Sequence, residues 1–436
     1  MMSVHKLTAG DGYTYLTRQV AASDSTERGR ASLSDYYAEK GEAPGRWVGA
    51  GLPGVGLTCG EVVGEDQMVF LFGAGRHPNT GEALGRPFPV YDSASSYRSQ
   101  VAVAFAGHNT GHGLDAHAPV SAEVRAQIRT EVARQMFTDK HRRAPVDARE
   151  LSGFIAQVSR QPSAAVAGYD LTFSPVKSIS TLWALAPREV AEQIQAAHWA
   201  AVEETVGWLE RDVAFTRVGS GGIRQVVVRG LLAAAFTHRD SRAGDPDLHT
   251  HVAVSNKVQT HDGRWFALDG RVLYAAAVTA SERYNTRLEA ELVDRLGVRF
   301  AARGAPDGKR AIREIVGVND LLNRHWSSRR CDIEARQSEL ATGFQSRHGR
   351  PPTAVEAVTL AQQATLETRD ARHEPRSQAV QRSLWRQEAA KLLGSDREVD
   401  FMIDEALGHR TPALPATSDW MTACAATVIG VLEEHR

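Results

Sequence analysis

Alternating hydrophobic and polar positions predict several β-strands in the first 300 residues. A short alternating stretch, SVHKL, lies near the N-terminus, and residues 167–185 (AGYDLTFSPVKSISTLWAL) alternate and then become continuously apolar. Residues 213–230 contain two strand patterns joined by Ser-Gly-Gly, which is a hairpin signal. Two further strands are predicted at residues 230–238 and 247–260, with a polar loop between them.

Apolar residues at helical spacing predict amphipathic helices between and after these strands. Ser121 is placed to cap a helix over residues 121–142, and Pro187 begins a second one that runs to residue 211. A third helix is expected near residues 275–296, whereas residues 73–119 look dominated by loops. After about residue 300 the strand patterns stop and the remainder is expected to be mostly helical.

This order of elements predicts an α+β fold, in which an antiparallel sheet with flanking helices precedes a mainly helical module. We expect the first domain to cover residues 1–300, with a long insertion at about 60–166, and the helical module to cover 301–436. The 436 residues, 42% of them hydrophobic and 24% charged, are enough for a sizeable core and typical of a globular protein.

The distribution of apolar residues and cysteines excludes several classes of protein. The longest uncharged apolar runs are far shorter than the roughly 20 residues that span a bilayer, so no membrane insertion is expected. The N-terminus shows no secretory signal, and a cytoplasmic location is predicted. The three cysteines are odd in number and widely spaced, which indicates neither a disulfide framework nor a cysteine metal site.

Net charge gives little indication of a nucleic-acid partner. The chain has 51 basic and 52 acidic side chains, a formal charge of -1, which argues against coating of nucleic acid through bulk positive charge. A local groove is still compatible with this balance. Residues 301–350 hold ten lysines and arginines against six aspartates and glutamates.

Three histidines form the most informative pattern in the sequence. His249 and His251 are two apart on a predicted strand, so both imidazoles should project from one face, about 7 Å apart. His238 ends the preceding strand, and the Gly-Asp-Pro loop would bring the two strands together in antiparallel pairing. Three neutral imidazoles on adjacent strands can hold one divalent ion and leave other positions open for phosphate oxygens and water. Hydrolytic zinc enzymes also use three histidines, so a metal alone does not identify the reaction.

An aspartate and several tyrosines add candidate chemistry. Asp170, in GYDLTFS, could accept a proton from the far nitrogen of a metal-bound histidine or activate a nucleophile. Four of the nine tyrosines lie within the first 37 residues, as Tyr13, Tyr15, Tyr36 and Tyr37. A tyrosine hydroxyl becomes a usable nucleophile toward phosphorus when a base and a metal favour its phenolate.

Together these motifs resemble the TraI/TrwC (MobF) class of conjugative relaxases in the HUH endonuclease superfamily. The resemblance follows the N-terminal tyrosines, SDYYAEKG, GRWVGAG, GYDLTFSPVKS, HRDSRAGDPDLHTHVAVSNKV and DGRWFALDGRVLY, and so covers most of residues 1–300. It implies a palm-like HUH relaxase fold. The implied activity is a metal-dependent DNA nicking and joining reaction on single-stranded or extruded origin-of-transfer (oriT) DNA, through a 5′-phosphotyrosyl intermediate during plasmid mobilisation.

The resemblance also implies roles for particular residues. His238, His249 and His251 would hold Mg²⁺ or Mn²⁺, with Zn²⁺ as an in vitro substitute. Asp170 would orient a ligand histidine or help to deprotonate the tyrosine. Tyr13 would be the nucleophile by position, with Tyr15 as the alternative because the family's adjacent pair is here Tyr13-Thr14-Tyr15. Tyr36 and Tyr37 look like the second tyrosine pair of the family, and Arg242 matches an arginine near the scissile phosphate.

Other features set the expected partners and the competing functions. Trp265, Trp326, Arg329 and Arg330 are candidate contacts for single-stranded DNA, and relaxosome accessory and coupling proteins are the implied partners. No GxxxxGK[ST] motif occurs, so we expect either a fragment of a longer relaxase–helicase or a lineage without the motor. A rolling-circle replication initiator, a transposase of the same superfamily, a zinc-dependent phosphoester hydrolase and a simple DNA-binding module remain alternatives.

Overall fold

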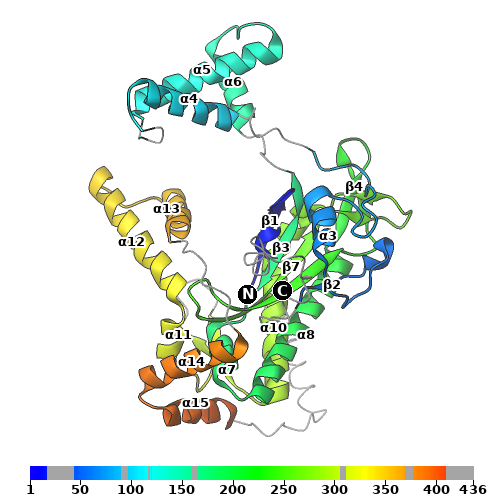
Figure 1. The fold of residues 1–436 in the computed structure, drawn as a ribbon, viewed down its shortest axis with the longest axis vertical. Helices are drawn as coiled ribbons and strands as arrows, with labels where there is room; N and C mark the ends of the chain where they lie inside the picture. Colours follow the sequence, from blue (N-terminus) through cyan, green and yellow to red (C-terminus); the bar gives the residue numbers. More distant parts are fainter. Residues whose placement is uncertain are drawn as a thin grey trace, which may run out of the picture.

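The computed structural model describes residues 1–16, 44–89, 97–115, 118, 120–159, 165–304, 311–368 and 377–408. Its centre is a five-stranded antiparallel sheet in the order β1-β3-β7-β6-β2 (Figure 1). The bounds of these strands are Met2–Thr8 for β1, Arg46–Val48 for β2, Val166–Phe173 for β3, Ala233–Asp240 for β6 and Pro246–Ser255 for β7. The predicted α+β class with an antiparallel sheet is confirmed.

One face of the sheet is covered by two long helices, α8 (Arg188–Asp212) and α10 (Ala277–Leu296) (Figure 1). Leu171 of β3 and Val252 of β7 pair across the sheet and belong to the same buried cluster as Ile194 of α8 and Leu288 of α10. Because side chains alternate along a strand, the positions between these apolar residues face the other way. The functional residues described below lie on that second face.

A second, smaller core covers the opposite face. It joins Trp47 of β2, Phe236 of β6 and Ala253 of β7 to residues of two short helices, η1 (Leu52–Val55) and η2 (Val69–Gly73), the latter a π-helix that follows α3 (Glu65–Met68). The N-terminal segment after β1 packs into the same core through Leu16, which is fully buried. These contacts fix the segment that carries the first tyrosines.

The expected insertion contains a three-helix unit with a core of its own. Helices α4 (Tyr97–Gly111), α5 (Ala122–His141) and α6 (Ala148–Ser159) pack around Phe137 and Phe154, whose rings meet edge to face at 5.2 Å. Figure 1 shows this unit set apart from the sheet. The predicted helix with the Ser121 cap is therefore present, whereas the expectation of a loop-dominated segment up to residue 119 is wrong for α4, a helix rich in small residues.

The continuously apolar part of residues 167–185 is a helix, α7 (Lys177–Leu185), and not a continuation of strand β3. Every residue from Ser178 to Leu185 is buried. A helix that is buried on all sides shows no amphipathic period, so its apolar run cannot be distinguished from a buried strand by pattern. By contrast, the Ser-Gly-Gly hairpin is present as β4 (Phe215–Val218) and β5 (Arg224–Val227), joined by η3 (Ser220–Gly222).

Two short strands and a short helix connect the central sheet to α10. Strands β8 (Val258–Gln259) and β9 (Trp265–Phe266) and helix α9 (Gly270–Ala275) lead into α10. The expectation that strands stop near residue 300 is wrong, because β10 (Phe300–Arg303) pairs with β11 (Ile312–Ile315).

The remaining described residues are helical, as predicted. They form α11 (Asp320–His325), α12 (Ser328–His348), α13 (Ala354–Glu367), α14 (Gln378–Leu393) and α15 (Asp396–Gly408). Trp326, Trp385 and Ile403 from this part share the main buried cluster with Trp183 of α7. The helices after residue 300 thus share a hydrophobic core with the residues before it. The domain boundary expected at residue 300 stays a prediction. Within the described residues, no helix combines the length and apolar character that a bilayer crossing requires.

A buried polar chain connects the two long helices to the centre of the sheet. The imidazole of His198 on α8 lies 2.8 Å from Tyr284 Oη on α10 through Nδ1, and 2.8 Å from Thr250 Oγ1 on β7 through Nε2. Thr250 Oγ1 in turn lies 2.9 Å from Thr237 Oγ1 on β6. Burial, and secondarily His249, lowers the pKa of His198 from 6.5 to about 3.

This shift predicts an acid-dependent loss of stability. Between pH 6.5 and about 3, the unfolded chain binds a proton at His198 that the folded protein does not, so the free energy of unfolding falls as the pH falls. We expect wild type to lose up to about 1.4 kcal/mol per pH unit more than His198→Gln below pH 6.5. Urea denaturation of both proteins between about pH 4.5 and 7.5 measures this difference, and parallel pH profiles would contradict it.

Candidate metal and tyrosine site

The three predicted histidines converge on one point of the second sheet face. His238 of β6 stands directly opposite His249 of β7 in the antiparallel register, and His251 follows two positions later on the same face. The ring centroids are separated by 5.2 Å for His238–His249 and by 5.1 Å for each of the other two pairs. One nitrogen from each ring lies within 4.8 Å of the other two. The hairpin thus arranges three nitrogen donors as one prospective ligand set.

Hydrogen bonds at Nδ1 determine which nitrogen of two of these rings can bind a metal. His249 Nδ1 lies 2.7 Å from the carbonyl oxygen of Asp247, and His251 Nδ1 lies 2.9 and 3.0 Å from the two carboxylate oxygens of Asp170. A carbonyl or carboxylate oxygen accepts, so the network assigns the proton to Nδ1 in both rings and leaves the Nε2 lone pair available. This is the arrangement that metal-binding histidines adopt in proteins.

Electrostatics favour the neutral form of His249, the form that metal binding requires. Burial lowers the pKa of His249, and the neighbouring His251 acts in the same direction, while the Asp247 carboxylate opposes the shift. Three imidazole nitrogen donors on one side leave the remaining positions of a divalent ion open toward a substrate. The residues therefore fit a catalytic metal centre rather than a closed structural one.

Tyr15 completes this group of side chains. Its hydroxyl donates a hydrogen bond to Asp170 Oδ2, and its ring meets His251 edge to face at a centroid distance of 5.9 Å. Asp170 is buried, and its carboxylate is therefore shared between the tyrosine and the metal-ligand candidate. Burial, and next the Asp170 carboxylate, raises the pKa of Tyr15 well above its usual range. Tyr15 is consequently protonated at rest, with a proton acceptor already in contact.

Tyr13, by contrast, belongs to the second core. Its side chain is 6% exposed and packs on Phe72 of η2, with ring centroids 6.3 Å apart. Burial raises the pKa of its hydroxyl, as do the more distant Asp11 and Glu65. Tyr13 and Leu16 are buried in this core, whereas Tyr15 between them packs at its edge and directs its hydroxyl to Asp170.

The other predicted site residues are distributed differently. Arg242 lies half-buried in the turn between β6 and β7, four positions after His238. Tyr36 and Tyr37 lie outside the described residues. Lys177 donates to the carbonyl oxygen of Pro246 at 2.9 Å and so supports the start of β7.

The tryptophans and arginines proposed as DNA contacts differ in burial and in their partners. Trp326 is 1% exposed and donates through its indole Nε1 to Glu388 at 3.0 Å, so its proposed role in base stacking is wrong. Trp265 is half-buried against the second core, and Arg330 pairs with Glu334 one helical turn away, at 2.7 Å. The sequence around an aromatic residue does not by itself show whether its ring packs in the core or is exposed to a ligand.

Two contributors to the site were not singled out in the sequence. Thr172 donates from Oγ1 to Asp170 Oδ2 at 3.3 Å and lies 3.2 Å from His251 Nδ1. The sequence did contain a signal for Thr172: it lies two residues after Asp170 on the same strand, and side chains at that spacing share a face of the sheet. The backbone carbonyl of Asp247, which orients His249, carries no side-chain signal at all.

Comparison with known proteins identifies relatives of this chain. The TrwC relaxase family model matches residues 9–392. The multifunctional conjugation protein TraI of Escherichia coli is 33% identical over 204 residues, which cover 39% of this chain and 11% of TraI. TraI of strain K12 is 35% identical over 161 residues, which cover 35% of this chain and 9% of that protein. The matched part thus spans only about a tenth of the length of these relatives.

Solved structures of the conjugative relaxase TrwC share the fold. A copper-bound complex of TrwC with oriT DNA superposes with a TM-score of 0.56 at 24% identity, covering 91% of this chain and 99% of the chain in that structure. TrwC complexed with a 27-mer DNA that comprises the recognition hairpin and the cleavage site gives a TM-score of 0.54 at 22% identity, with the same coverage. With nearly nine-tenths of its length matched by the family model, this chain belongs to the TrwC relaxase family.

Proposed function

We propose that this protein nicks and rejoins single-stranded oriT DNA through Tyr15 during conjugative plasmid transfer. The observation that carries the proposal is the contact chain from Tyr15 through Asp170 to His251, beside two further converging histidines, in a member of the TrwC relaxase family. The relatives named above act in conjugation or are bound to oriT DNA, which supports the same substrate here.

In the proposed reaction, the Tyr15 hydroxyl oxygen attacks the phosphorus of one phosphodiester in line with the leaving 3′-oxygen. The bond from tyrosine oxygen to phosphorus forms, the bond from phosphorus to the 3′-oxygen breaks, and that oxygen leaves as a hydroxyl after taking a proton from solvent. Since the pKa of Tyr15 is raised, its proton moves to Asp170 as attack proceeds. The product is a 5′-phosphotyrosyl link, which a 3′-hydroxyl can attack in reverse to rejoin the strand.

His238, His249 and His251 would hold Mg²⁺ or Mn²⁺, and Zn²⁺ is a plausible substitute in vitro. Such an ion, when bound, supplies positive charge to the non-bridging phosphate oxygens. Asp170 has two functions in this proposal: it fixes the His251 ring through Nδ1 and accepts the Tyr15 proton. The accessory and coupling proteins, the cytoplasmic location and the roles of Arg242, Tyr36 and Tyr37 stay predictions.

The experiment that tests the function uses a random-sequence library of single-stranded oligonucleotides. We expect strands labelled at the 3′ end to remain attached to the protein on a denaturing gel when Mg²⁺ or Mn²⁺ is present, and strands labelled at the 5′ end to be released as shortened products. Sequencing of the attached strands then identifies the nick site.

Three results would contradict the proposal. Shortened strands without any protein adduct would indicate a metal-dependent phosphoester hydrolase. Strand binding that is insensitive to chelator and produces no cleavage would indicate a DNA-binding module. Attachment through the 3′ end of a strand, detected with the 5′ label, would indicate the opposite polarity of cleavage.

A further inference from the structure

We propose that helices α12 and α14, from the part of the chain after residue 300, position the histidine hairpin for metal binding. The inference rests on the metal site in the proposed function. Its subject is the turn of residues 241–245, which connects His238 on β6 to His249 on β7. Residues distant in sequence hold both ends of this turn and one carbonyl within it.

Helix α14 makes two of these contacts. Gln381 Nε2 donates to Asp240 Oδ2 at 2.6 Å, and Trp385 Nε1 donates to the carbonyl oxygen of Gly244 at 2.8 Å. Both donors are almost completely buried, at 3% and 2% exposure. Hydrogen bonds in so dry an environment are costly to leave unmade, so α14 restrains the end of β6 and the turn together.

Helix α12 makes the third contact, at its N-terminus. The buried carboxylate of Asp245 accepts from the Ser328 backbone N–H at 3.1 Å and from Ser328 Oγ at 3.0 Å. The preceding residue, Ser327, provides no side-chain cap to the helix. Asp245 therefore acts as the cap from a different part of the chain, and the positive end of the helix dipole stabilises its charge.

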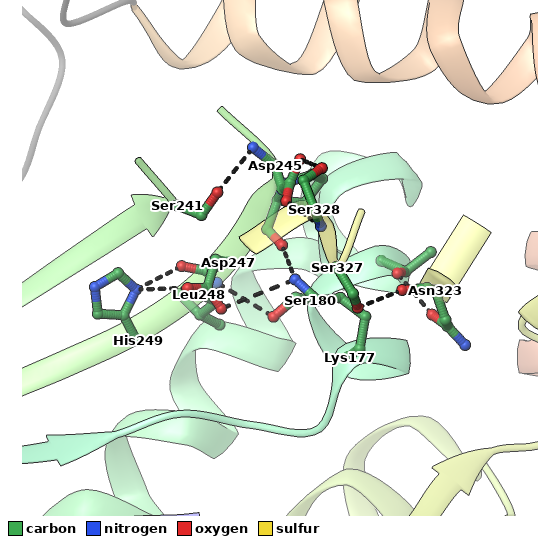
Figure 2. A network of polar contacts seen from close by, with 12 residues as sticks. Lys177, Ser180, Ser241, Asp245, Asp247, Leu248, His249, Asn323, Ser327 and Ser328 are labelled. Carbon is green, nitrogen blue, oxygen red and sulfur yellow. Dashed lines mark hydrogen bonds and ion pairs between the residues drawn. The ribbon is translucent and has the colours of Figure 1, made fainter. Parts of the chain in front are cut away.

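Helix α7 holds the start of β7. Ser180 Oγ accepts from the Leu248 N–H at 3.2 Å, and Lys177 Nζ, which donates to the Pro246 carbonyl, also lies 4.0 Å from Asp247 Oδ1. Figure 2 shows this network running from His249 through the residues before it to Ser328 at the start of α12. The hairpin is thus held by contacts from α7, α12 and α14, and α7 and α14 also pack on each other through Trp183 and Trp385.

These hydrogen bonds would affect metal binding by restraining the positions of the histidine side chains relative to one another. His238 and His249 are the last regular pair of the β6–β7 ladder, which becomes irregular between His238 and Asp240, so the anchored turn begins directly beside the two rings. Binding is strongest when ligand atoms are held in the required geometry before the metal arrives, and loss of supporting partners typically weakens metal affinity about 10- to 100-fold. Gln381, Trp385 and Ser328 are positioning residues in this sense, with no direct contact to the ion.

The test measures metal affinity in the full chain without DNA. We expect the double variant Gln381→Met/Trp385→Phe, which removes both donors but keeps most of the side-chain volume, to bind Mn²⁺ about tenfold more weakly by electron paramagnetic resonance. The visible absorption of bound Co²⁺ should also change, because it reports ligand geometry. Trp183→Phe is the matched control: it removes a buried indole N–H from the same core, and that N–H has no acceptor among the described residues.

The outcomes separate this inference from the proposed function. Equal Mn²⁺ affinity and Co²⁺ spectra in wild type, the double variant and Trp183→Phe would overturn the positioning role. Equal losses in the double variant and the control would also overturn it, because general loosening of the core would explain both. If His249→Ala/His251→Ala binds Mn²⁺ as tightly as wild type, the metal site itself is wrong. Should the double variant fail to fold, Ser328→Ala removes one hydroxyl at the same turn and is expected to weaken Mn²⁺ binding severalfold.

Discussion

Tyr15→Phe is expected to abolish the covalent protein–DNA adduct, by roughly 10³-fold or more, while Tyr13→Phe retains it. The physical reason is geometric: among the tyrosines that the structure describes, only Tyr15 places its hydroxyl against Asp170 and its ring beside His251. Tyr13 instead packs its ring on Phe72 in an apolar core. The measurement is the fraction of 3′-labelled strand retained by protein on a denaturing gel.

The design must exclude a substitute nucleophile. Because Tyr36 and Tyr37 resemble a second tyrosine pair, the same two variants should also be made in a Tyr36→Phe/Tyr37→Phe background. Tyr13→Phe is the matched control, since it removes the same atom from a residue two positions away. Adduct formation that survives Tyr15→Phe in that background but disappears in Tyr13→Phe would return the role to Tyr13, the residue that position along the chain had favoured.

His249→Ala/His251→Ala is expected to reduce strand cleavage by two or more orders of magnitude and to reduce Mn²⁺ binding with it. The substitution removes two of the three converging nitrogen donors, and a single imidazole rarely retains a divalent ion. Cleavage rates and Mn²⁺ titrations on the same preparations measure both effects. Wild type treated with a chelator should match the variant.

The control for this variant is His261→Ala/His325→Ala, which removes two exposed imidazoles outside the triad. It should bind Mn²⁺ and cleave DNA like wild type. Undiminished cleavage by the triad variant in the presence of chelator would refute the metal centre, even if the tyrosine adduct were confirmed. The two experiments therefore test separate parts of the proposed reaction.

The histidine triad could be predicted from sequence because it depends on local geometry. Residues that are two positions apart on a strand have side chains on the same face, which relates His249 to His251. A short polar turn pairs the preceding strand with theirs and so brings His238 opposite His249. Asp170 and Thr172 obey the same rule on β3. The structure places all five side chains on one face of the sheet.

The choice between the first tyrosines could not be made in this way. Their segment follows β1 through a turn, where no regular period relates side-chain direction to position. Because Tyr13 and Leu16 are buried in the second core, the hydroxyl of Tyr15 is directed toward Asp170. That core includes residues far along the chain, such as Phe236 and Ala253, and their approach is a property of the fold rather than of local spacing.

The same limit applies to the apolar run in α7 and to the supports of the turn. A completely buried helix shows neither a polar face nor alternation, so pattern favours strand and helix equally. Gln381 and Asp240 are 141 positions apart, and neither residue type signals a partner. Such contacts are visible only once the helices after residue 300 are docked.

The alternation along β7 has a consequence for how this family can vary. His249 and His251 face the site, while Leu248, Thr250 and Val252 face the helices, so the strand carries two functions interleaved residue by residue. A single-residue insertion or deletion within β7 would exchange the faces, burying imidazoles against α8 and presenting apolar side chains to the substrate. Substitution can therefore alter either function separately, but a change of length inside this strand damages catalysis and the main core together.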